Sequence, residues 1–283
     1  MFRLVVSAFC MAAAVYAQDV TVRAPSDAVA GNAAKIATTG SGSATFYLVG
    51  PSSVVKRDVQ LGQEISLSPK EVQSAGRYVA IVCAGSCANA DFFVAPAKPV
   101  SLVFLVHPSR APVAKNDLIS GAALPFDEYH NMVLTPSTVD FQLSAKGGTP
   151  LSHKVETHNG AAWFRISSGK SAGPLQITAA MNDVVARRVV QQVASDPCNL
   201  RIKGLRTPKG IEVETDPVRD CSGNPVPDGT IITFTAKNGD ETSTVDAPVK
   251  QDVARARITA KGPVVISAAS GVVMGNQLRM SGQ

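Results

Sequence analysis

Residues 220–234 read Asp-Cys-Ser-Gly-Asn-Pro-Val-Pro-Asp-Gly-Thr-Ile-Ile-Thr-Phe, and their pattern is the clearest indication of the fold. Its first ten positions are rich in Gly, Pro, Asn and Asp, the residues that favour turns. Apolar residues then alternate with threonines, which puts Ile232 and Phe234 on one face of a half-buried strand. Residues 237–240, Lys-Asn-Gly-Asp, carry the strongest hairpin signal of the chain. The stretch therefore predicts a turn, an antiparallel strand and a hairpin.

The same pattern occurs 93 residues earlier, where residues 127–141 read Asp-Glu-Tyr-His-Asn-Met-Val-Leu-Thr-Pro-Ser-Thr-Val-Asp-Phe. In both copies Asn follows the first Asp by four residues and Phe follows it by fourteen. Two further matches come in the same order, residues 160–166 with 252–258 and residues 173–179 with 262–268. One domain type is therefore used twice. A period near 90 residues is too long for a solenoid repeat and fits a whole sandwich domain.

The later copy resembles the bacterial immunoglobulin-like domains of the invasin and intimin type. That family carries the pattern Asp-x-x-Gly-Asn-x-Val-x-Asp-Gly-Thr-x-Val-x-Phe, followed by Gly-Val-Ala-x-Ala-x-Leu and a closing strand that ends in Val-x-Ala. Residues 220–234, 253–258 and 265–268 match it nearly throughout. Asp252 stands where the family has Gly before Val253, so we expect that turn to be built differently.

The earlier copy is similar to the same family but departs from it at two points. His130 replaces Gly, and residues 135–136, Thr-Pro, replace Asp-Gly. The resemblance covers about 180 residues. It implies an all-β fold of tandem immunoglobulin-like β-sandwiches, which in that family are mainly stalk-like spacers of surface adhesins, with some terminal copies recruited for binding. The motif marks the fold and brings no catalytic residues with it.

The remaining N-terminal part forms a third unit by its composition. Short apolar runs alternate with Gly and Ser turns, and residues 75–80 resemble a late immunoglobulin-like strand in which Tyr78 ties a corner. Residues 95–99 and 195–197 contain Pro and read as linkers. We therefore predict a signal peptide and three domains, at residues 1–17, 18–96, 97–195 and 196–283.

The first 17 residues predict export. They contain one basic residue, Arg3, an apolar stretch of about 12 residues, and small residues before Gln18, where we expect cleavage. The apolar stretch is shorter than the roughly 20 residues that span a bilayer, so we expect no membrane span after cleavage. Phe9 before Cys10 argues against lipid attachment. The predicted location is secreted, periplasmic or at the cell surface.

Four cysteines remain after cleavage, and in an oxidising compartment they are expected to form disulfides. Three pairings are possible, and we predict the two local ones, which each stay inside one proposed domain: Cys83 with Cys87, and Cys198 with Cys221. A metal clip and a redox pair are the alternatives for the first pair. Zinc would need two more ligands nearby, and catalytic dithiols usually have two intervening residues rather than three.

The composition argues against nucleic-acid binding and disorder. The formal charge is +5, but the 27 Lys and Arg are scattered, and they are adjacent only at residues 56–57 and 187–188. Basic residues interleaved with stacking aromatics are typical of nucleic-acid binding, and aromatic residues are 5% of this chain. With 45% hydrophobic and 17% charged residues the chain should fold.

No catalytic motif is present in the sequence. The histidines are the natural candidates for acid-base or metal chemistry, and we place the last two in an exposed loop: His107, His130, His153 and His158. The acidic pairs at residues 127–128 and 240–241 fall in predicted turns, where Asp caps the backbone. We predict no enzyme activity and no cofactor.

Calcium is the metal that this sequence favours most. Aspartates at joints between extracellular sandwiches bind it in some proteins, and four aspartates could converge here: Asp196, Asp216, Asp220 and Asp228. No Asp-x-Asp-x-Asp run exists in the chain. We therefore predict no metal site.

Trp163 is the only tryptophan, whereas a carbohydrate-binding module would want several exposed aromatic rings. In the repeat, Trp163 aligns with either Arg255 or Ala256. Alignment with Arg255 would expose Trp163 as part of a binding patch, whereas alignment with Ala256 would bury it in the core. Of these two positions we favour the core. The run from Val100 to Val106 predicts a buried strand.

The predicted function is adhesion or interaction with a protein or glycan at a cell surface. The alternative is a passive spacer or an accessory subunit of an envelope assembly.

Overall fold

The computed structural model describes residues 20–282, so the predicted signal peptide lies outside the described residues. Regular structure in this part of the chain is β-strand, apart from one 3-10 turn, η1 (Pro69–Val72). The predicted all-β fold is confirmed. None of the helical structure in residues 20–282 is long and apolar enough to cross a membrane.

The chain divides into two compact units. The first contains the described residues up to Ser101 together with residues 125–133, and the second contains residues 102–124 and those from 134 onward. The described residues form three separate hydrophobic cores, one in the first unit and two in the second.

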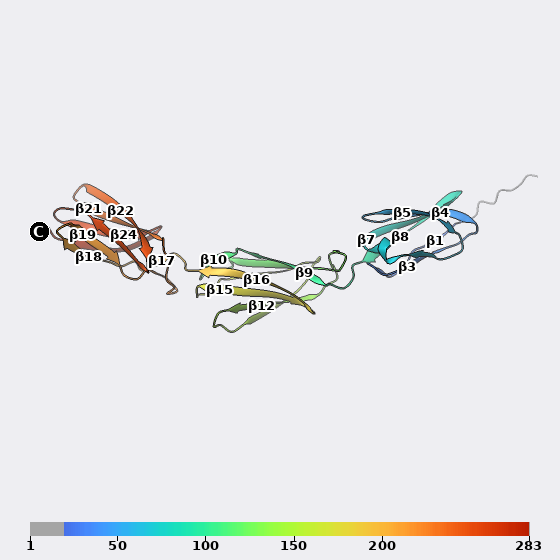
Figure 1. The fold of residues 1–283 in the computed structure, drawn as a ribbon, viewed down its shortest axis with the longest axis horizontal. Helices are drawn as coiled ribbons and strands as arrows, with labels where there is room; N and C mark the ends of the chain where they lie inside the picture. The colour runs from blue at the N-terminus through green and yellow to red at the C-terminus, as the bar shows by residue number, and fades with distance from the viewer. Residues whose placement is uncertain (1–19, 283) are drawn as a thin grey trace, which may run out of the picture. The chain divides into compact units, whose positions relative to one another are not determined.

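The first unit holds a two-sheet sandwich (Figure 1). The sheet orders are β1-β3-β6 and β2-β8-β7-β4-β5. The strands are β1 (Val22–Arg23), β2 (Ala28–Val29), β3 (Ala34–Thr38), β4 (Ser43–Val49), β5 (Val54–Gln60), β6 (Ile65–Leu67), β7 (Gly76–Ala84) and β8 (Ser86–Ala95).

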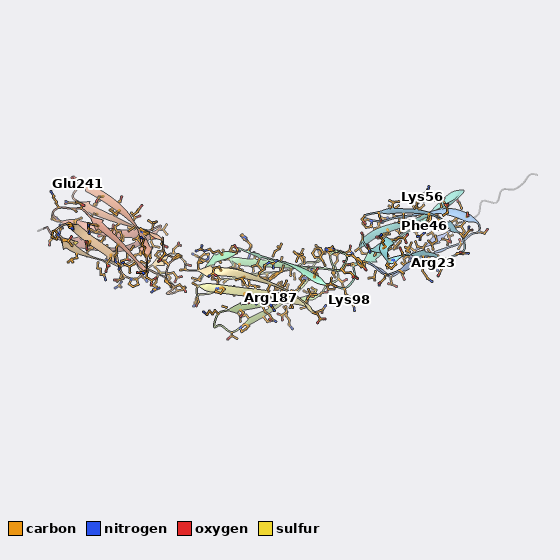
Figure 2. The ribbon with its side chains drawn as sticks, in the orientation of Figure 1. Arg23, Phe46, Lys56, Lys98, Arg187 and Glu241 are labelled. Carbon is orange, nitrogen blue, oxygen red and sulfur yellow. A yellow bond between two sulfur atoms is a disulfide. The ribbon has the colours of Figure 1, made fainter. Side chains whose placement is uncertain are left out.

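Alternating side chains of these strands make the first core. Phe46 is fully buried between the sheets, whereas Arg23 and Lys56 point outward (Figure 2). Tyr78 is buried near the start of β7, and its hydroxyl donates a hydrogen bond to the carbonyl of Ser74 at 2.9 Å. The predicted tyrosine corner is therefore confirmed.

The middle sandwich consists of a five-stranded sheet, β10-β16-β15-β12-β13, and a three-stranded sheet, β14-β11-β9. Its strands are β9 (Ser101–His107), β10 (Arg110–Pro112), β11 (Ile119–Phe126), β12 (Thr138–Ala145), β13 (Leu151–Glu156), β14 (Ala162–Ile166), β15 (Gly173–Met181) and β16 (Val184–Val193). The rings of Phe104, Phe141 and Phe164 fill its core, with centroid separations of 4.7 to 6.4 Å.

The last sandwich has the continuous strand order β18-β19-β23-β22-β21-β24-β25, with a short pair β17-β20 beside it. β22 pairs with β21 over most of its length and with β23 at Val249 and Lys250, which joins the two layers. The strands are β17 (Pro197–Cys198), β18 (Ile202–Thr207), β19 (Gly210–Thr215), β20 (Arg219–Asp220), β21 (Ile231–Asn238), β22 (Glu241–Lys250), β23 (Val253–Ile258), β24 (Val264–Ser270) and β25 (Val273–Met280).

The repeat seen in the sequence is present in the pairing of the strands. Phe141 of β12 lies opposite Ala179 of β15, and Phe234 of β21 lies opposite Ala268 of β24. Both phenylalanines are fully buried, each in its own core. The prediction that they are equivalent core residues is confirmed.

The expectation of a buried strand at residues 100–106 is wrong for one face. On β9, Phe104 is fully buried, but Val103 and Leu105 are exposed. An unbroken apolar run predicts burial on both faces of a strand. Here β9 lies at the edge of a three-stranded sheet whose outward face meets solvent.

Candidate interaction surface

The Asp that opens the repeated pattern is a structural anchor in the last sandwich. Asp220 is buried, at the end of β20. Its carboxylate accepts hydrogen bonds of 2.9 to 3.2 Å from the side-chain amide of Asn224 and from three backbone N–H groups, those of Ser195, Ser222 and Asn224. It therefore holds both the turn and the linker before the sandwich.

Asp127 repeats this arrangement within the first unit. It is buried, and its carboxylate accepts hydrogen bonds of 2.8 to 2.9 Å from the side-chain amide of Asn131 and from the backbone N–H of Ala97, Tyr129 and Asn131. The prediction that this Asp caps a turn is confirmed. The bond to Ala97, thirty residues away, could not be read from the turn alone.

The Asn of the pattern makes a second, more distant contact. In the second unit, Asn224 donates to the carbonyl of Lys170 at 2.8 Å and accepts from the N–H of Ala172 at 2.9 Å. In the first unit, Asn131 makes the same pair of bonds, both 2.8 Å, with Gln73 and Ala75. We call each set of Asp and Asn contacts an Asp–Asn clamp. Sequence reasoning missed it, and the repeated spacing of four between Asp and Asn was its signal.

The clamps lower the pKa of both aspartates. Burial alone would raise the pKa of Asp220, but the hydrogen bonds from the Asn224 side chain and from three backbone N–H groups outweigh it, so the pKa lies below its ordinary 3.8. The pKa of Asp127 is lowered in the same way, against the effect of burial, by Asn131 and by backbone N–H groups. Both carboxylates are therefore ionised at neutral pH.

We expect Asp220→Asn to lower the free energy of unfolding of the last sandwich by about 1.5 to 3 kcal/mol at pH 7, because it removes a charged acceptor from several N–H donors. Since the pKa is depressed in the folded state, this stabilisation is complete above the ordinary value of 3.8 and is lost as pH falls through the folded pKa. Urea unfolding at pH 7 and pH 2.5 measures it. If the free energy of unfolding of the variant were below that of wild type by the same amount at both pH values, this role would be contradicted.

Two departures from the family pattern fall on left-handed backbone. His130 has a φ of 65°, and Asp252 has a φ of 70°, a region that favours Gly. Asp252 keeps this conformation and pairs with Arg219 at 2.8 Å. The expectation that its turn is built differently from the family's stays a prediction; in this chain the Asp adopts a backbone conformation that suits Gly and gains an ion pair.

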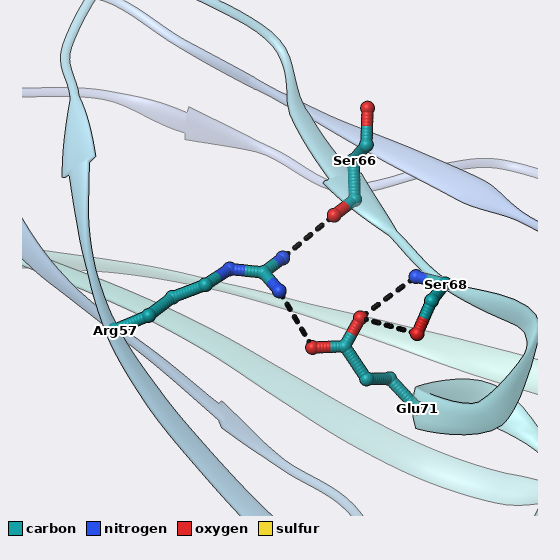
Figure 3. Close-up of polar contacts among 4 residues, drawn as sticks. All are labelled: Arg57, Ser66, Ser68 and Glu71. Atoms are coloured by element: carbon teal, nitrogen blue, oxygen red, sulfur yellow. Dashed lines mark hydrogen bonds and ion pairs between the residues drawn. The ribbon is translucent and has the colours of Figure 1, made fainter.

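A network of polar contacts among four residues links the two sheets of the first sandwich (Figure 3). Arg57 on β5 donates to Glu71 on η1 at 2.7 Å and to the carbonyl of Ser66 on β6 at 2.6 Å. Glu71 in turn accepts from the N–H and hydroxyl of Ser68. Because β5 and β6 belong to different sheets, the contact ties the two layers together. We interpret it as structural, since the two charges neutralise each other.

The four cysteines within residues 20–282 form two disulfide bonds. Cys83 and Cys87 lie opposite each other in the β7–β8 hairpin, with their sulfur atoms 2.05 Å apart. Cys198 on β17 is joined to Cys221, directly after Asp220, with sulfur atoms 2.01 Å apart. Each bond lies within one sandwich.

The other candidate residues do not gather into one site. His107 ends β9, and His153 is exposed on β13 rather than in a loop, whereas His158 is exposed beyond that strand. Asp220 is held by its clamp, and Asp228 accepts from the N–H of Gln251 at 3.0 Å. Within residues 20–282 no group of three or more His, Cys, Asp or Glu side chains could hold a metal ion.

Trp163 is exposed, which corrects the core position that we favoured. It lies opposite Ala122 in the pairing of β14 with β11, as Arg255 lies opposite Glu214 in the pairing of β23 with β19. The repeat therefore aligns Trp163 with Arg255, and 67% of its surface is open to solvent. Its ring belongs to the outward face of the three-stranded sheet.

A groove of about 560 Å³ runs along this outward face. We call it the Trp163 groove; it is lined by Leu105, Val106, His107, Ser120, Gly121, Ala122, Trp163, Phe164 and Arg188. Arg188 comes from the other sheet. It lies on the same face of β16 as buried Val190, at a part of the strand that β10 does not cover.

The equivalent face of the last sandwich has a different chemistry. There Glu214 pairs with Lys203 and Arg255, and Glu212 pairs with Arg257, each at 2.9 Å. On this face each cation is paired with a glutamate, and Leu205 is exposed beside them. The middle sandwich thus differs from its own repeat in presenting a tryptophan in place of Arg255 and small residues in place of the two glutamates.

Comparison with known proteins supports the fold. No protein-family model matches the sequence, and no curated protein matches it. Among solved structures, the chain is similar to FdeC, an Escherichia coli adhesin, with a TM-score of 0.64 and 16% identity over 94% of this chain and 96% of that one. It is also similar to invasin, a bacterial integrin-binding protein, with a TM-score of 0.54 and 14% identity over 94% of this chain and 60% of that one. The chain is therefore a tandem array of immunoglobulin-like β-sandwiches, with the fold of these bacterial adhesin and invasin domains.

Proposed function

We propose that this chain is an exported, non-catalytic protein that acts as an adhesion or interaction module at a bacterial cell surface or in the envelope. In this proposal residues 1–17 are removed on export, and residues 18–96, 97–195 and 196–283 form three immunoglobulin-like domains. The two disulfides support an oxidising location, whether secreted, periplasmic or at the cell surface. The partner is a protein or glycan of a cell surface.

The observation that carries this proposal is the exposed apolar face around Trp163. Leu105 on β9 and Trp163 on β14 are 58% and 67% exposed on the two strands that flank β11, and together with Val103 they make a face of the kind that marks interaction sites. Nothing in the core of the sandwich requires a tryptophan at this position, because Arg255 serves at the equivalent place. The likeness in fold to an adhesin and to an integrin-binding protein supports the same role.

The absence of catalysis in this proposal rests on how the polar residues are used. The buried aspartates are occupied by backbone donors in the Asp–Asn clamps, and the ion pairs of the first and last sandwiches are closed within the protein. The four histidines lie on separate elements, and all of them are exposed. A nucleophile with an adjacent base, the usual arrangement in covalent catalysis, has no counterpart in these contacts.

A passive spacer or accessory subunit is the second candidate, and the clamp in the second unit favours it. Asn224 and Asp220 tie the last sandwich both to the linker at Ser195 and to the loop at residues 170–172. Such bonds limit bending between successive sandwiches, which is what a spacer needs. The two functions differ in whether the chain itself binds a surface.

Binding to cells tests the proposal. Fluorescently labelled mature chain should bind epithelial or bacterial cells in a saturable manner, and Trp163→Ala should reduce binding at least ten-fold. Val272→Ala is the matched control, because Val272 is an apolar residue that is almost fully exposed in a turn of the last sandwich. Thermal unfolding checks that both variants fold. If wild-type chain binds neither cell type, the spacer becomes the better proposal.

A further inference from the structure

We propose that the Trp163 groove binds a segment of a partner protein in which an apolar side chain is flanked by carboxylates. The apolar side chain would pack on Trp163 and Leu105, and the carboxylates would pair with Arg188 and Arg165. This inference rests on the proposed interaction function and names the chemistry of its partner. It is carried by the shape, the apolar surface and the charge of the groove.

The shape favours a side chain inserted between two walls. Trp163 on β14 and Leu105 on β9 flank β11, whose outward residues at this level are the small Ser120 and Ala122. Small residues between two large ones leave a trough. Its volume of about 560 Å³ lies in the range of sites that hold ligands, roughly 300 to 1,000 Å³.

The charge of the groove is one-sided. Arg188 lines it, and Arg165 lies two residues beyond Trp163 on the same face of β14, opposite Ser120. The lining contains no carboxylate, and within the described residues neither arginine forms an ion pair. The guanidinium of Arg188 donates a hydrogen bond to the backbone carbonyl of Arg187. An acidic partner would supply the missing anions.

The last sandwich provides an internal comparison. Its equivalent face carries three cations, and each of them is paired with one of two glutamates within the same face. The middle sandwich has Ser120 and Ala122 on the central strand, where the last has Glu212 and Glu214. The cations of the Trp163 groove thus lack the carboxylates that their repeat possesses.

The apolar surface favours a protein over a glycan. Sugar sites combine aromatic rings with polar groups, and this face offers one aromatic ring beside the exposed aliphatic residues Val103 and Leu105. Aliphatic side chains gain from contact with apolar side chains, and Trp and Arg are the residues enriched where protein interfaces gain most of their energy. We therefore commit to a protein segment.

Trp163 reports on the groove without a label, because it is the only tryptophan in the chain. The probe is an end-blocked decapeptide of alternating Leu and Glu, added to the full mature chain while the tryptophan emission is recorded. We expect a saturable blue shift, at least ten-fold weaker binding of the matched peptide of alternating Leu and Lys, and weaker binding of the acidic peptide as salt rises.

Charge reversal supplies the decisive variants. Arg188→Glu should weaken binding of the acidic peptide at least ten-fold, and Arg165→Glu should also weaken it. Arg187→Glu is the matched control, since Arg187 is the exposed neighbour on β16 that does not line the groove. We expect it to leave binding within about two-fold of wild type, because charges separated by solvent are screened.

The other outcomes are informative. Equal binding of both peptides, or no effect of Arg188→Glu, would overturn the proposed charge pairing. A saturable shift with a uronic-acid tetrasaccharide but none with the peptide would assign the groove to a glycan. A shift that depends only on chain concentration would show that a second copy covers the face. If cell binding needs Trp163 but no acidic peptide binds, the partner chemistry is wrong while the proposed function stands; if no cell binding occurs, the proposed function itself fails.

Discussion

Replacing Phe234 by Ala is expected to lower the free energy of unfolding of the last sandwich by about 3 to 5 kcal/mol. The side chain is fully buried in the core of that sandwich, on β21, the strand that pairs with both β22 and β24. Truncation therefore leaves a cavity that a paired strand cannot close. The loss is a large share of the total stability of a small domain.

Phe141→Ala should have an effect of the same size on the middle sandwich. The ring of Phe141 packs against Phe104 and Phe164, with centroids 5.9 and 4.7 Å away, so its removal also takes away two aromatic contacts. Because the three cores are separate, each variant should shift one unfolding transition and leave the others unchanged. Scanning calorimetry of residues 18–283 resolves this.

The control for Phe234 must be chosen with the structure in hand. The alternation of the sequence places Thr233 on the solvated face and makes Thr233→Ala look neutral. In the structure Thr233 is half-buried, and its hydroxyl donates to Asp246 at 2.6 Å. Lys237→Ala, at an exposed position of the same strand, should change stability by less than about 0.5 kcal/mol. Equal losses for Phe234→Ala and Lys237→Ala would contradict the core assignment.

The fold was predictable wherever one local rule decided it. A period of two placed Ile232 and Phe234 on the buried face, and Asn-Gly at residues 238–239 marked the hairpin between β21 and β22. Tyr78 was recognisable from its place near the start of a strand. These features depend on a few neighbouring residues, so the sequence contains all the information that they need.

The candidate site was not predictable in the same way. Alternation shows that β9 and β14 have two faces, but only the packing of the sheets shows which face is covered, so Trp163 and Leu105 were misplaced. The Asp–Asn clamp has the same limit. The spacing of Asp220 and Asn224 indicates a turn, whereas the partners of Asn224 lie more than fifty residues earlier in the chain.

Arg188 illustrates a third limit. Its neighbour Arg187 is chemically identical, and the sequence offers no reason to distinguish them. Arg188 lines the Trp163 groove only because its strand, β16, extends past β10 and leaves that stretch uncovered. The length of the neighbouring strand β10 thus decides which of the two adjacent arginines lines the groove.

The bond between Cys198 and Cys221 should contribute about 3 kcal/mol to the last sandwich, and Cys221→Ser is expected to cost about 2 to 5 kcal/mol. The two residues are 23 apart, and the loop between them contains β18 and β19. Without the bond this long loop is free in the unfolded chain. Cys83→Ser should cost less, nearer to 2 kcal/mol, since only three residues lie between Cys83 and Cys87 and the β7–β8 ladder already holds them together.

Urea unfolding under oxidising conditions measures these losses, and peptide mapping without reductant checks the pairing.

Cys221 directly follows Asp220, so a substitution there could also act through the clamp rather than through the lost bond. Cys198→Ser separates the two causes, because Cys198 gives no hydrogen bond to the Asp220 carboxylate. If the bond is the cause, Cys198→Ser, Cys221→Ser and the double variant should all lose the same stability, since a disulfide can be broken only once. A larger loss for Cys221→Ser than for Cys198→Ser would instead measure how far the clamp depends on its neighbour, and modification of four free thiols in the folded chain would contradict both bonds.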